Sequence, residues 1–296
     1  MPKPPETSSE RLDDRTPKWN LIIDVANSVH ANNCVLAAKD EYVGNDHPGY
    51  CAPIPEEGGD IVWVDRKVRG ETPVVDTSYL LQMCNHCDNG PCQKVGGDAV
   101  TKRPDGIVII DPIKAKGRKD IVQACPFGAV IWNEELQLPQ HWIFDAHLLD
   151  AGWPHPRFVD VSPKGAVEAV KISDAEMQER AREERLEVLK PHLGTRPRVY
   201  YKNLYRFTSC FVGGALVIES GGGLECVEGA DVHLSQDGKP IASTLSDAFG
   251  EFRFDGLEPG SGAYSLSASH PEAGTASAEV EIAEESVVLK DWRLTN

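Results

Sequence analysis

Four cysteines in two separate stretches place the strongest constraint on how this chain can fold. Cys84, Cys87 and Cys92 lie close together, whereas Cys125 lies far downstream and is followed by Pro126. In bacterial iron–sulfur motifs the first three cysteines bind one cluster, and the cysteine before proline binds the neighbouring cluster. The spacing therefore predicts that these four thiolates close one [4Fe–4S] site, and that the fold brings the two stretches together.

Four segments carry the iron–sulfur repeat, and most of their ligand positions are empty. Residues 125–130, CPFGAV, recur as SPKGAV at 162–167, so that a serine stands where a cysteine is expected. Residues 28–38 keep the spacing C-x2-C-x2-C-x3-C but contain only one cysteine, Cys34. One set of four is complete while the others are emptied together, which favours a single cluster. The predicted lost ligand positions are Ser28, Ala31, Ala38, Ala115, Arg118, Ile121 and Ser162, with further ones near Gly96, Phe144, His147 and Phe158.

Three residue assignments leave alternatives open. Zinc also accepts four thiolates in a closed structural site, although the divided ligand set and the proline after Cys125 favour iron–sulfur. Cys34 is interpreted as a leftover position that packs as a small apolar group, because its companion ligands are absent. His86 stands between two predicted ligands and is expected to hold the cluster loop, with a hydrogen bond to a cluster sulfur as its functional role.

Composition excludes several classes of function. The formal charge of −16 argues against nucleic acid, because phosphate binding needs a basic surface. No apolar run is long enough to span a bilayer, and the residues around Pro2–Pro5 lack the apolar stretch of a signal peptide. Thiolates acquire metal in reducing surroundings, so assembly in the cytoplasm is expected, with export on a partner's signal left open. No nucleophile with a base and no phosphate-binding loop stands at motif spacing, so no catalytic residue is predicted.

The patterning predicts an α+β chain of three parts. Residues 1–168 contain short β-branched runs interrupted by Gly and Pro, as expected of a ferredoxin-like iron–sulfur domain with degenerate repeats. Residues 169–209 are expected to be a helical linker, because Ser173 and Glu176 form a capping box before a helix-forming run that extends to Lys190. Residues 210–296 predict a seven-stranded β-sandwich. Its strands are expected at 215–219, 231–235, 241–245, 251–254, 263–268, 276–282 and 287–294, with Cys210 and Cys226 as buried free thiols.

These residues together carry a resemblance to a known family. The run at 19–24, the emptied motif after it, CNHCDNGPC at 84–92 and Cys125-Pro126 resemble the iron–sulfur subunits of molybdopterin oxidoreductases of the dimethyl sulfoxide reductase family. Three further parts of the chain make the resemblance more specific: residues 103–116, residues 200–211 and the acidic β-sandwich, which is similar to carboxypeptidase regulatory-like domains. They resemble the small subunits of pyrogallol–phloroglucinol transhydroxylases and related anaerobic aromatic-ring hydroxylases.

The resemblance implies a large catalytic subunit that holds a molybdenum or tungsten bis-pterin cofactor and acts on phenolic substrates. This chain is then the non-catalytic subunit of a heterodimer in anaerobic aromatic metabolism. Relatives keep more clusters than the single one predicted here. Three functions therefore stay open: an electron relay between the large subunit and a soluble carrier, a structural scaffold whose cluster is not used in turnover, and a zinc-stabilised interaction module.

Overall fold

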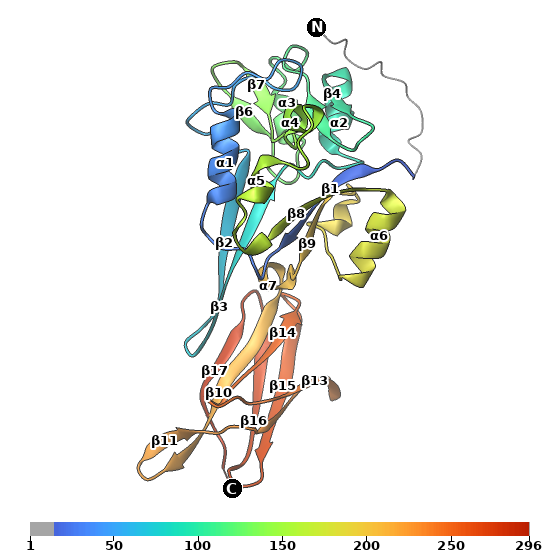
Figure 1. The fold of residues 1–296 in the computed structure, drawn as a ribbon. Coiled ribbons are helices and arrows are strands. Elements are labelled where there is room, and N and C mark those ends of the chain that lie inside the picture. The colour runs from blue at the N-terminus through green and yellow to red at the C-terminus, as the bar shows by residue number, and fades with distance from the viewer. Residues whose placement is uncertain (1–14, 296) are drawn as a thin grey trace. The chain divides into compact units, whose positions relative to one another are not determined.

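The computed structural model describes residues 15–295, which form two compact units (Figure 1). The first unit contains the described residues up to Asp65 together with Tyr79–Leu204, and the second contains Arg66–Ser78 and the chain from Tyr205 onward. The segment around Pro2–Pro5, where no export signal is expected, lies outside the described residues. Within residues 15–295, no helix has the length and apolar character needed to cross a membrane.

The first unit contains a three-stranded sheet. Its central strand is β1 (Lys18–Asp24), which pairs antiparallel with β8 (Val167–Ile172) and parallel with β9 (Val199–Lys202). β1 contains the apolar run expected at 19–23, and Leu21 and Ile23 are fully buried. A central strand that is buried on both faces reads as a continuous apolar run, which is the pattern seen in β1.

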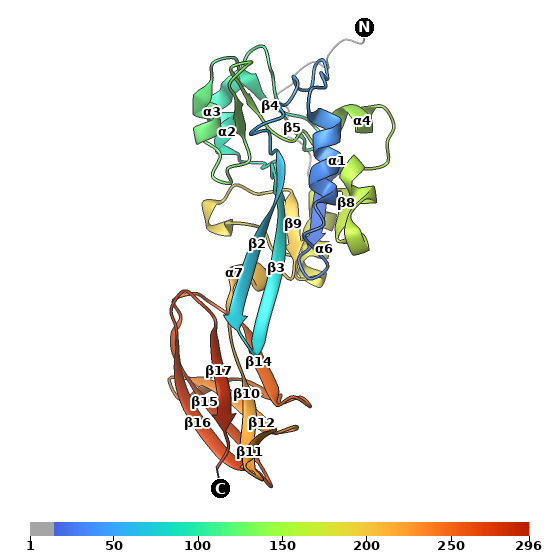
Figure 2. The ribbon, with the colours of Figure 1, turned by 90° about the vertical axis from the view of Figure 1, so that its left-hand side faces the viewer.

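Short helices and hairpins build the rest of the first unit. Hairpin β4–β5 turns at Arg103–Gly106, where Gly106 donates its N–H to the carbonyl oxygen of Arg103 and takes a φ of 87° that favours glycine. In Figure 2 this hairpin lies beside α2 and α3. The bounds are α1 (Asn33–Tyr42), α2 (Pro91–Gly96), η1 (Gly97–Ala99), β4 (Val100–Lys102), β5 (Val108–Ile110), α3 (Lys119–Gln123), β6 (Ile131–Asn133), β7 (Leu138–Gln140), α4 (Ala146–Asp150), α5 (Arg157–Asp160), η2 (Pro163–Gly165) and η3 (Pro191–Leu193).

Helix α6 (Asp174–Glu183) begins at the predicted capping box but is shorter than expected. Ser173 Oγ accepts the N–H of Glu176, and the Glu176 side chain accepts the N–H of Ser173. The expectation that the helix reaches Lys190 is wrong. The chain leaves the helix because Arg185 adopts a left-handed conformation, with φ of 54°, and the following residues pair with β9 through a bridge between Glu187 and Tyr201.

The second unit is the predicted β-sandwich. One sheet has the order β11-β10-β14, with β17 also paired to β10, and the other has the order β13-β12-β15-β16. Alternate residues of β12 and β14 are buried, such as Val232 and Leu234, as a sheet with one solvated face requires. All seven predicted strands are present, and β11 is an addition. The bounds are β10 (Cys210–Ser220), β11 (Gly223–Cys226), β12 (Asp231–Gln236), β13 (Lys239–Leu245), β14 (Glu251–Leu257), β15 (Gly262–His270), β16 (Gly274–Ile282) and β17 (Val287–Arg293).

The two cysteines of the sandwich differ in burial. Cys210 is a buried free thiol, as expected. Cys226 is exposed, so the expectation of burial was wrong for that residue. The reason is its place in β11, a short strand at the edge of its sheet whose four residues are all exposed.

A hairpin, β2 (Val62–Glu71) and β3 (Val74–Met83), contributes its turn end to the second unit. There Arg69 is buried and donates to Asp76 at 2.6 Å, to Asp255 at 3.1 Å and to the carbonyl oxygen of Ser209 at 2.9 Å. Arg206 also pairs with Asp76. The two terminal nitrogens of the buried Arg69 guanidinium therefore bind acceptors that come from three parts of the second unit, whereas its Nε has no hydrogen-bond partner among the described residues.

We expect Asp76→Asn to lower the free energy of unfolding by about 3 kcal/mol near pH 7, because it leaves buried arginine charge less compensated. Burial by itself would raise the pKa of Asp76, but hydrogen bonds from Arg206 and Arg69 lower it below its ordinary value. A carboxyl group with a lower pKa in the folded state stabilises the fold above about pH 4, and this contribution is lost as the pH falls further. The deficit of the variant should therefore shrink below about pH 4.

Denaturant unfolding followed by circular dichroism at several pH values measures this deficit. Asp237→Asn, at an exposed turn of the sandwich, is the matched control and should leave the unfolding free energy within about 0.5 kcal/mol of the unchanged chain. A deficit for Asp76→Asn that stays constant down to pH 3 would contradict the ionic explanation.

Candidate metal centre

The chain that follows β3 forms a tight loop carrying three thiols. Cys84 and Cys87 are buried, and Cys92 is half-buried in the first turn of α2. Pro91 begins this helix, where its fixed φ suits the first turn and its missing N–H costs no hydrogen bond. A Cβ added to Gly90 would lie 3.3 Å from Cys92 Sγ and 3.6 Å from Cys87 Cβ. The nearest atom to such a Cβ would be Gln93 Nε2 at 2.8 Å, so a larger residue at Gly90 would crowd the loop beside its sulfur atoms.

Cys125 joins this loop from the distant stretch predicted by its spacing. It follows α3, which packs against α2, and Cys125 and Cys92 contact the same apolar cluster. The four thiols lie close enough that Cys92, Cys125 and Cys87 each influence the pKa of Cys84. Burial is the main cause that raises the pKa of Cys87 to about 12 and that of Cys92 to about 11. Any metal centre bound here must therefore displace protons from the thiols.

The spacing of the sulfur atoms distinguishes between a single ion and a cluster. Within residues 15–295, no three cysteine sulfur atoms lie within 4.8 Å of one another. Four thiolates on one zinc ion, each at about 2.3 Å from the metal, would be separated by only about 3.8 Å. An iron–sulfur cube places its thiolates farther apart because each binds a different iron atom. An all-thiol donor set in which no three sulfur atoms lie within 4.8 Å of one another thus fits a [4Fe–4S] cluster better than zinc.

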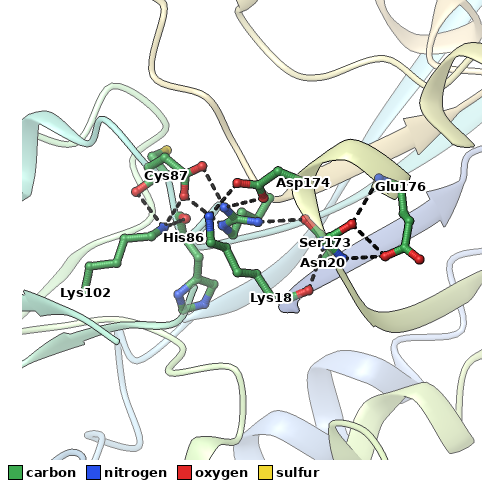
Figure 3. Close-up of polar contacts among 10 residues, drawn as sticks. Lys18, Asn20, His86, Cys87, Lys102, Ser173, Asp174 and Glu176 are labelled. Carbon is green, nitrogen blue, oxygen red and sulfur yellow. Dashed lines mark hydrogen bonds and ion pairs between the residues drawn. The ribbon is translucent and has the colours of Figure 1, made fainter. Parts of the chain in front are cut away.

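A network of charges surrounds the loop (Figure 3). Lys102 donates to the carbonyl oxygens of His86 at 2.6 Å and Cys87 at 3.1 Å, and pairs with Asp88 at 2.7 Å. Arg198 binds both carboxylate oxygens of Asp88 at 2.7 Å. Burial would raise the pKa of Asp88, but Lys102 and Arg198 lower it. Lys102, at the end of β4, therefore holds the backbone of the ligand loop, and Lys102 and Arg198 together hold the side chain of Asp88.

His86 fastens the same loop to β5. Its Nδ1 accepts the N–H of Val108 at 3.0 Å, and its ring packs edge-on against Trp142 and Phe144. Burial lowers the pKa of His86 well below its ordinary value, so the ring is neutral. Its Nε2 has no hydrogen-bond partner among the described residues. These contacts agree with a loop-holding role, and a hydrogen bond from His86 to a cluster sulfur stays a prediction.

Two of the positions predicted as lost ligands belong to an apolar core. Ala115 and Ile121 are fully buried in the cluster that also contains Val100 and Val130. Arg118 does not belong to this apolar cluster and pairs with Asp120. Apolar packing therefore fills the space in which the sequence repeat would have provided ligands.

Some of the positions predicted as the other emptied ligand set line a small cavity. Ser28, Cys34 and Ser162 line a space of about 20 Å³, which is enough for about one water molecule. Burial raises the pKa of Cys34 to about 11, and its thiol lies 3.7 Å from the carbonyl oxygen of Phe158. Ala38 is buried on α1, whereas Ala31 is exposed. The residues that line this cavity fit no cluster, in agreement with Cys34 being a leftover thiol.

Glu41, His47 and His147 form the one group of three possible non-sulfur ligands that converge within residues 15–295. His147 Nε2 lies 2.8 Å from Glu41, whose other oxygen accepts from Arg157 at 2.8 Å. The two imidazole rings are stacked with centroids 3.8 Å apart. The ion pairs of Glu41 with His147 and Arg157 tie α1 to α4 and α5.

Comparison with known proteins agrees with this geometry. Residues 75–171 match the family described as 4Fe-4S dicluster domain, and residues 217–295 match the carboxypeptidase regulatory-like domain. The chain is 42% identical over 246 residues to the pyrogallol hydroxytransferase small subunit of Pelobacter acidigallici, covering 82% of this chain and 88% of that one. The chain belongs to the iron–sulfur subunits of molybdopterin oxidoreductases.

Other iron–sulfur subunits of these enzymes are similar over shorter lengths. The chain is 39% identical over 195 residues to a tetrathionate reductase subunit of Salmonella typhimurium, covering 63% of this chain and 73% of that one. It is 30% identical over 148 residues to the beta subunit of dimethylsulfide dehydrogenase of Rhodovulum sulfidophilum, covering 47% and 44%. The predicted family and the α+β architecture are thus confirmed, and membership implies a catalytic large subunit as partner.

Proposed function

We propose that this iron–sulfur subunit relays electrons through one [4Fe–4S] cluster bound by Cys84, Cys87, Cys92 and Cys125. The relay connects a large catalytic subunit with an external electron carrier. The observation that carries the proposal is the convergence of these four thiols beside α2 and α3. They are the only cysteines in residues 75–171, the part that matches a dicluster domain.

Two features support one cluster rather than two or more. The apolar core around Ala115 and Ile121 leaves no thiolate for a second site. The cavity beside Cys34 is too small for a cube and offers one thiol. Electrons would therefore enter and leave through the same cluster, without a series of neighbouring clusters in this chain.

The substrate class is inferred from the relative named for pyrogallol, a ring with several hydroxyl groups. We propose that the partner acts on phenolic substrates and that it holds the molybdenum or tungsten bis-pterin cofactor at which the ring reacts. This chain would then supply no catalytic residue.

A structural scaffold is the second candidate function, and the emptied ligand positions favour it. A transhydroxylation moves a hydroxyl group without net electron flow, so it would not need a relay. The cluster would then serve to tie two distant loops together, and loss of the other redox sites would carry no penalty.

Anaerobic co-purification with the large subunit tests these functions. We expect about four iron and four acid-labile sulfide per small chain, a large partner chain that contains pterin, and an EPR signal that appears on reduction and changes during turnover. Iron in the partner is subtracted with a complex that carries Cys125→Ala. Zinc without sulfide would contradict the cluster, and a cluster whose oxidation state never changes in turnover would support the scaffold.

A further inference from the structure

The cluster proposed above comes closest to the surface beside α2 and α3. Of its four thiols, Cys84 and Cys87 are buried, whereas Cys92 and Cys125 are half-buried. Cys92 belongs to α2, and Cys125 directly follows the end of α3. Electron transfer between proteins becomes steeply slower as the distance between redox centres grows. A protein that exchanges electrons with this cluster would therefore do so fastest from this side.

The surface on this side has an apolar centre and a basic surround. Ile113 is 86% exposed and Val95 is 42% exposed, which are large values for apolar side chains. A hydrogen bond of 2.8 Å from Arg118 to the carbonyl oxygen of Val95 joins α2 to the segment that contains Ile113. We define the α2–α3 face by its exposed or half-exposed residues Lys94, Val95, Ile113, Lys114, Lys116, Arg118 and Lys119.

This basic surround is unusual in a chain with a formal net charge of −16. Lys114, Arg118 and Lys119 each pair with one acidic residue. Lys94 and Lys116 have no ion-pair partner among residues 15–295. An acidic partner would meet uncompensated positive charge on this face and like charge over much of the remaining chain.

We propose that the α2–α3 face is the docking site of a small acidic electron-carrier protein. The proposal rests on the relay function proposed above and identifies the partner of that relay. In each encounter one electron leaves the reduced centre of the carrier and reduces the oxidised cluster, or passes in the opposite direction, and no bond forms or breaks. The carrier is favoured over the large catalytic chain, since lysine is depleted in the cores of permanent interfaces, whereas charged surrounds steer transient partners.

The test uses the complete complex with its large subunit and a reduced acidic ferredoxin as the probe. Lys94→Glu/Lys116→Glu is compared with Lys164→Glu/Lys239→Glu, which makes the same change of net charge at exposed positions that do not belong to the face. We expect the first variant to lower the second-order rate constant for cluster reduction at low salt by about tenfold or more. The control should stay within about twofold, and the salt dependence should become flatter only in the first variant.

Each other outcome would overturn the proposal. Equal slowing in both double variants would show an effect of net charge alone, and no slowing in either would remove the docking site. Failure of Lys94→Glu/Lys116→Glu to co-purify with the large subunit would assign the face to the permanent interface. Reduction by dithionite tests the relay separately from the docking site. If dithionite cannot reduce the cluster in the unchanged complex, the relay function itself is wrong.

Discussion

Cys125→Ala is expected to remove the whole cluster from this chain, with iron and sulfide falling from about four per chain to less than about one. The other three thiols come from one loop, so Cys125 alone closes the site from the side of α3. Without it, one iron atom would lose its protein ligand and be exposed to solvent beside two half-buried positions. Metal and sulfide analysis, together with loss of the EPR signal after reduction, measures the effect.

The fold should survive this loss well enough for the result to be interpreted. The apolar cluster that includes Val100, Val108, Ile110 and Ile121 packs α2 and α3 without any contribution from metal. Circular dichroism should therefore show similar strand and helix content in Cys125→Ala and in the unchanged chain. A reduced unfolding free energy is expected, because a metal centre that binds only the folded chain stabilises it.

Cys34→Ala is the matched control, since it removes a buried thiol from the same unit but from the small cavity. Its iron and sulfide content should equal that of the unchanged chain. A full cluster in Cys125→Ala, or its loss in Cys34→Ala, would mean that the ligand set is wrong. Retention of zinc by the unchanged chain with no sulfide would replace the cluster by a closed zinc site.

Local sequence signals predicted the parts of the structure that depend on neighbouring residues. Ser173 and Glu176 predicted the start of α6, because both members of a capping box lie within one turn. Alternation such as that in β12 predicted the sandwich strands, because a half-buried strand repeats every two residues. The thiol spacing predicted that Cys125 would approach the loop at 84–92, and this proximity is seen in the structure.

Other parts were not predicted, two of them despite a local signal and one because it depends on a partner far away in the chain. The emptied motif at 28–38 was expected only as a lost ligand loop, yet α1 begins at Asn33 within it, and the run NCVLAAKDEY contains several good helix formers. The hairpin β2–β3 was missed, although its alternating residues and the Gly70–Pro73 turn were a usable signal. The position at which α6 ends depends on a bridge to β9, which no local pattern shows.

The charged residues around the ligand loop were missed for the same reason. Asp88 and Arg198 are separated by most of the first unit in sequence, and either alone is an ordinary charged residue. The local signal available was an acidic residue directly after Cys87, in the loop that the spacing predicted to bind the cluster. A carboxylate that loses part of its solvent needs a cation, but the sequence did not indicate which one.

Arg198→Met is expected to lower the free energy of unfolding by about 3 kcal/mol, because Arg198 is a buried cation with several acidic and polar partners. Arg198 is buried and donates to both oxygens of Asp88, to Asp174 at 3.0 Å and to the side chain of Asn20 at 3.2 Å. Its removal leaves the half-buried Asp88 with Lys102 as its only cation. A half-buried carboxylate that loses one of two cationic partners keeps part of its desolvation cost, which the remaining partner offsets only in part.

The same substitution should loosen the ligand loop, because the Arg198 side chain holds Asp88 directly after Cys87. We therefore expect the complex with Arg198→Met to lose its cluster faster in the presence of an iron chelator, measured as bleaching of the cluster absorbance. Arg180→Met is the control, since Arg180 pairs with Glu168 and Glu184 at a more exposed site on α6. Exposed ion pairs contribute at most about 1 kcal/mol, so this control should change stability little and leave bleaching unchanged. Equal effects of the two substitutions would show that burial of Arg198 next to the thiol loop has no special role, and that the loop owes its shape to the cluster alone.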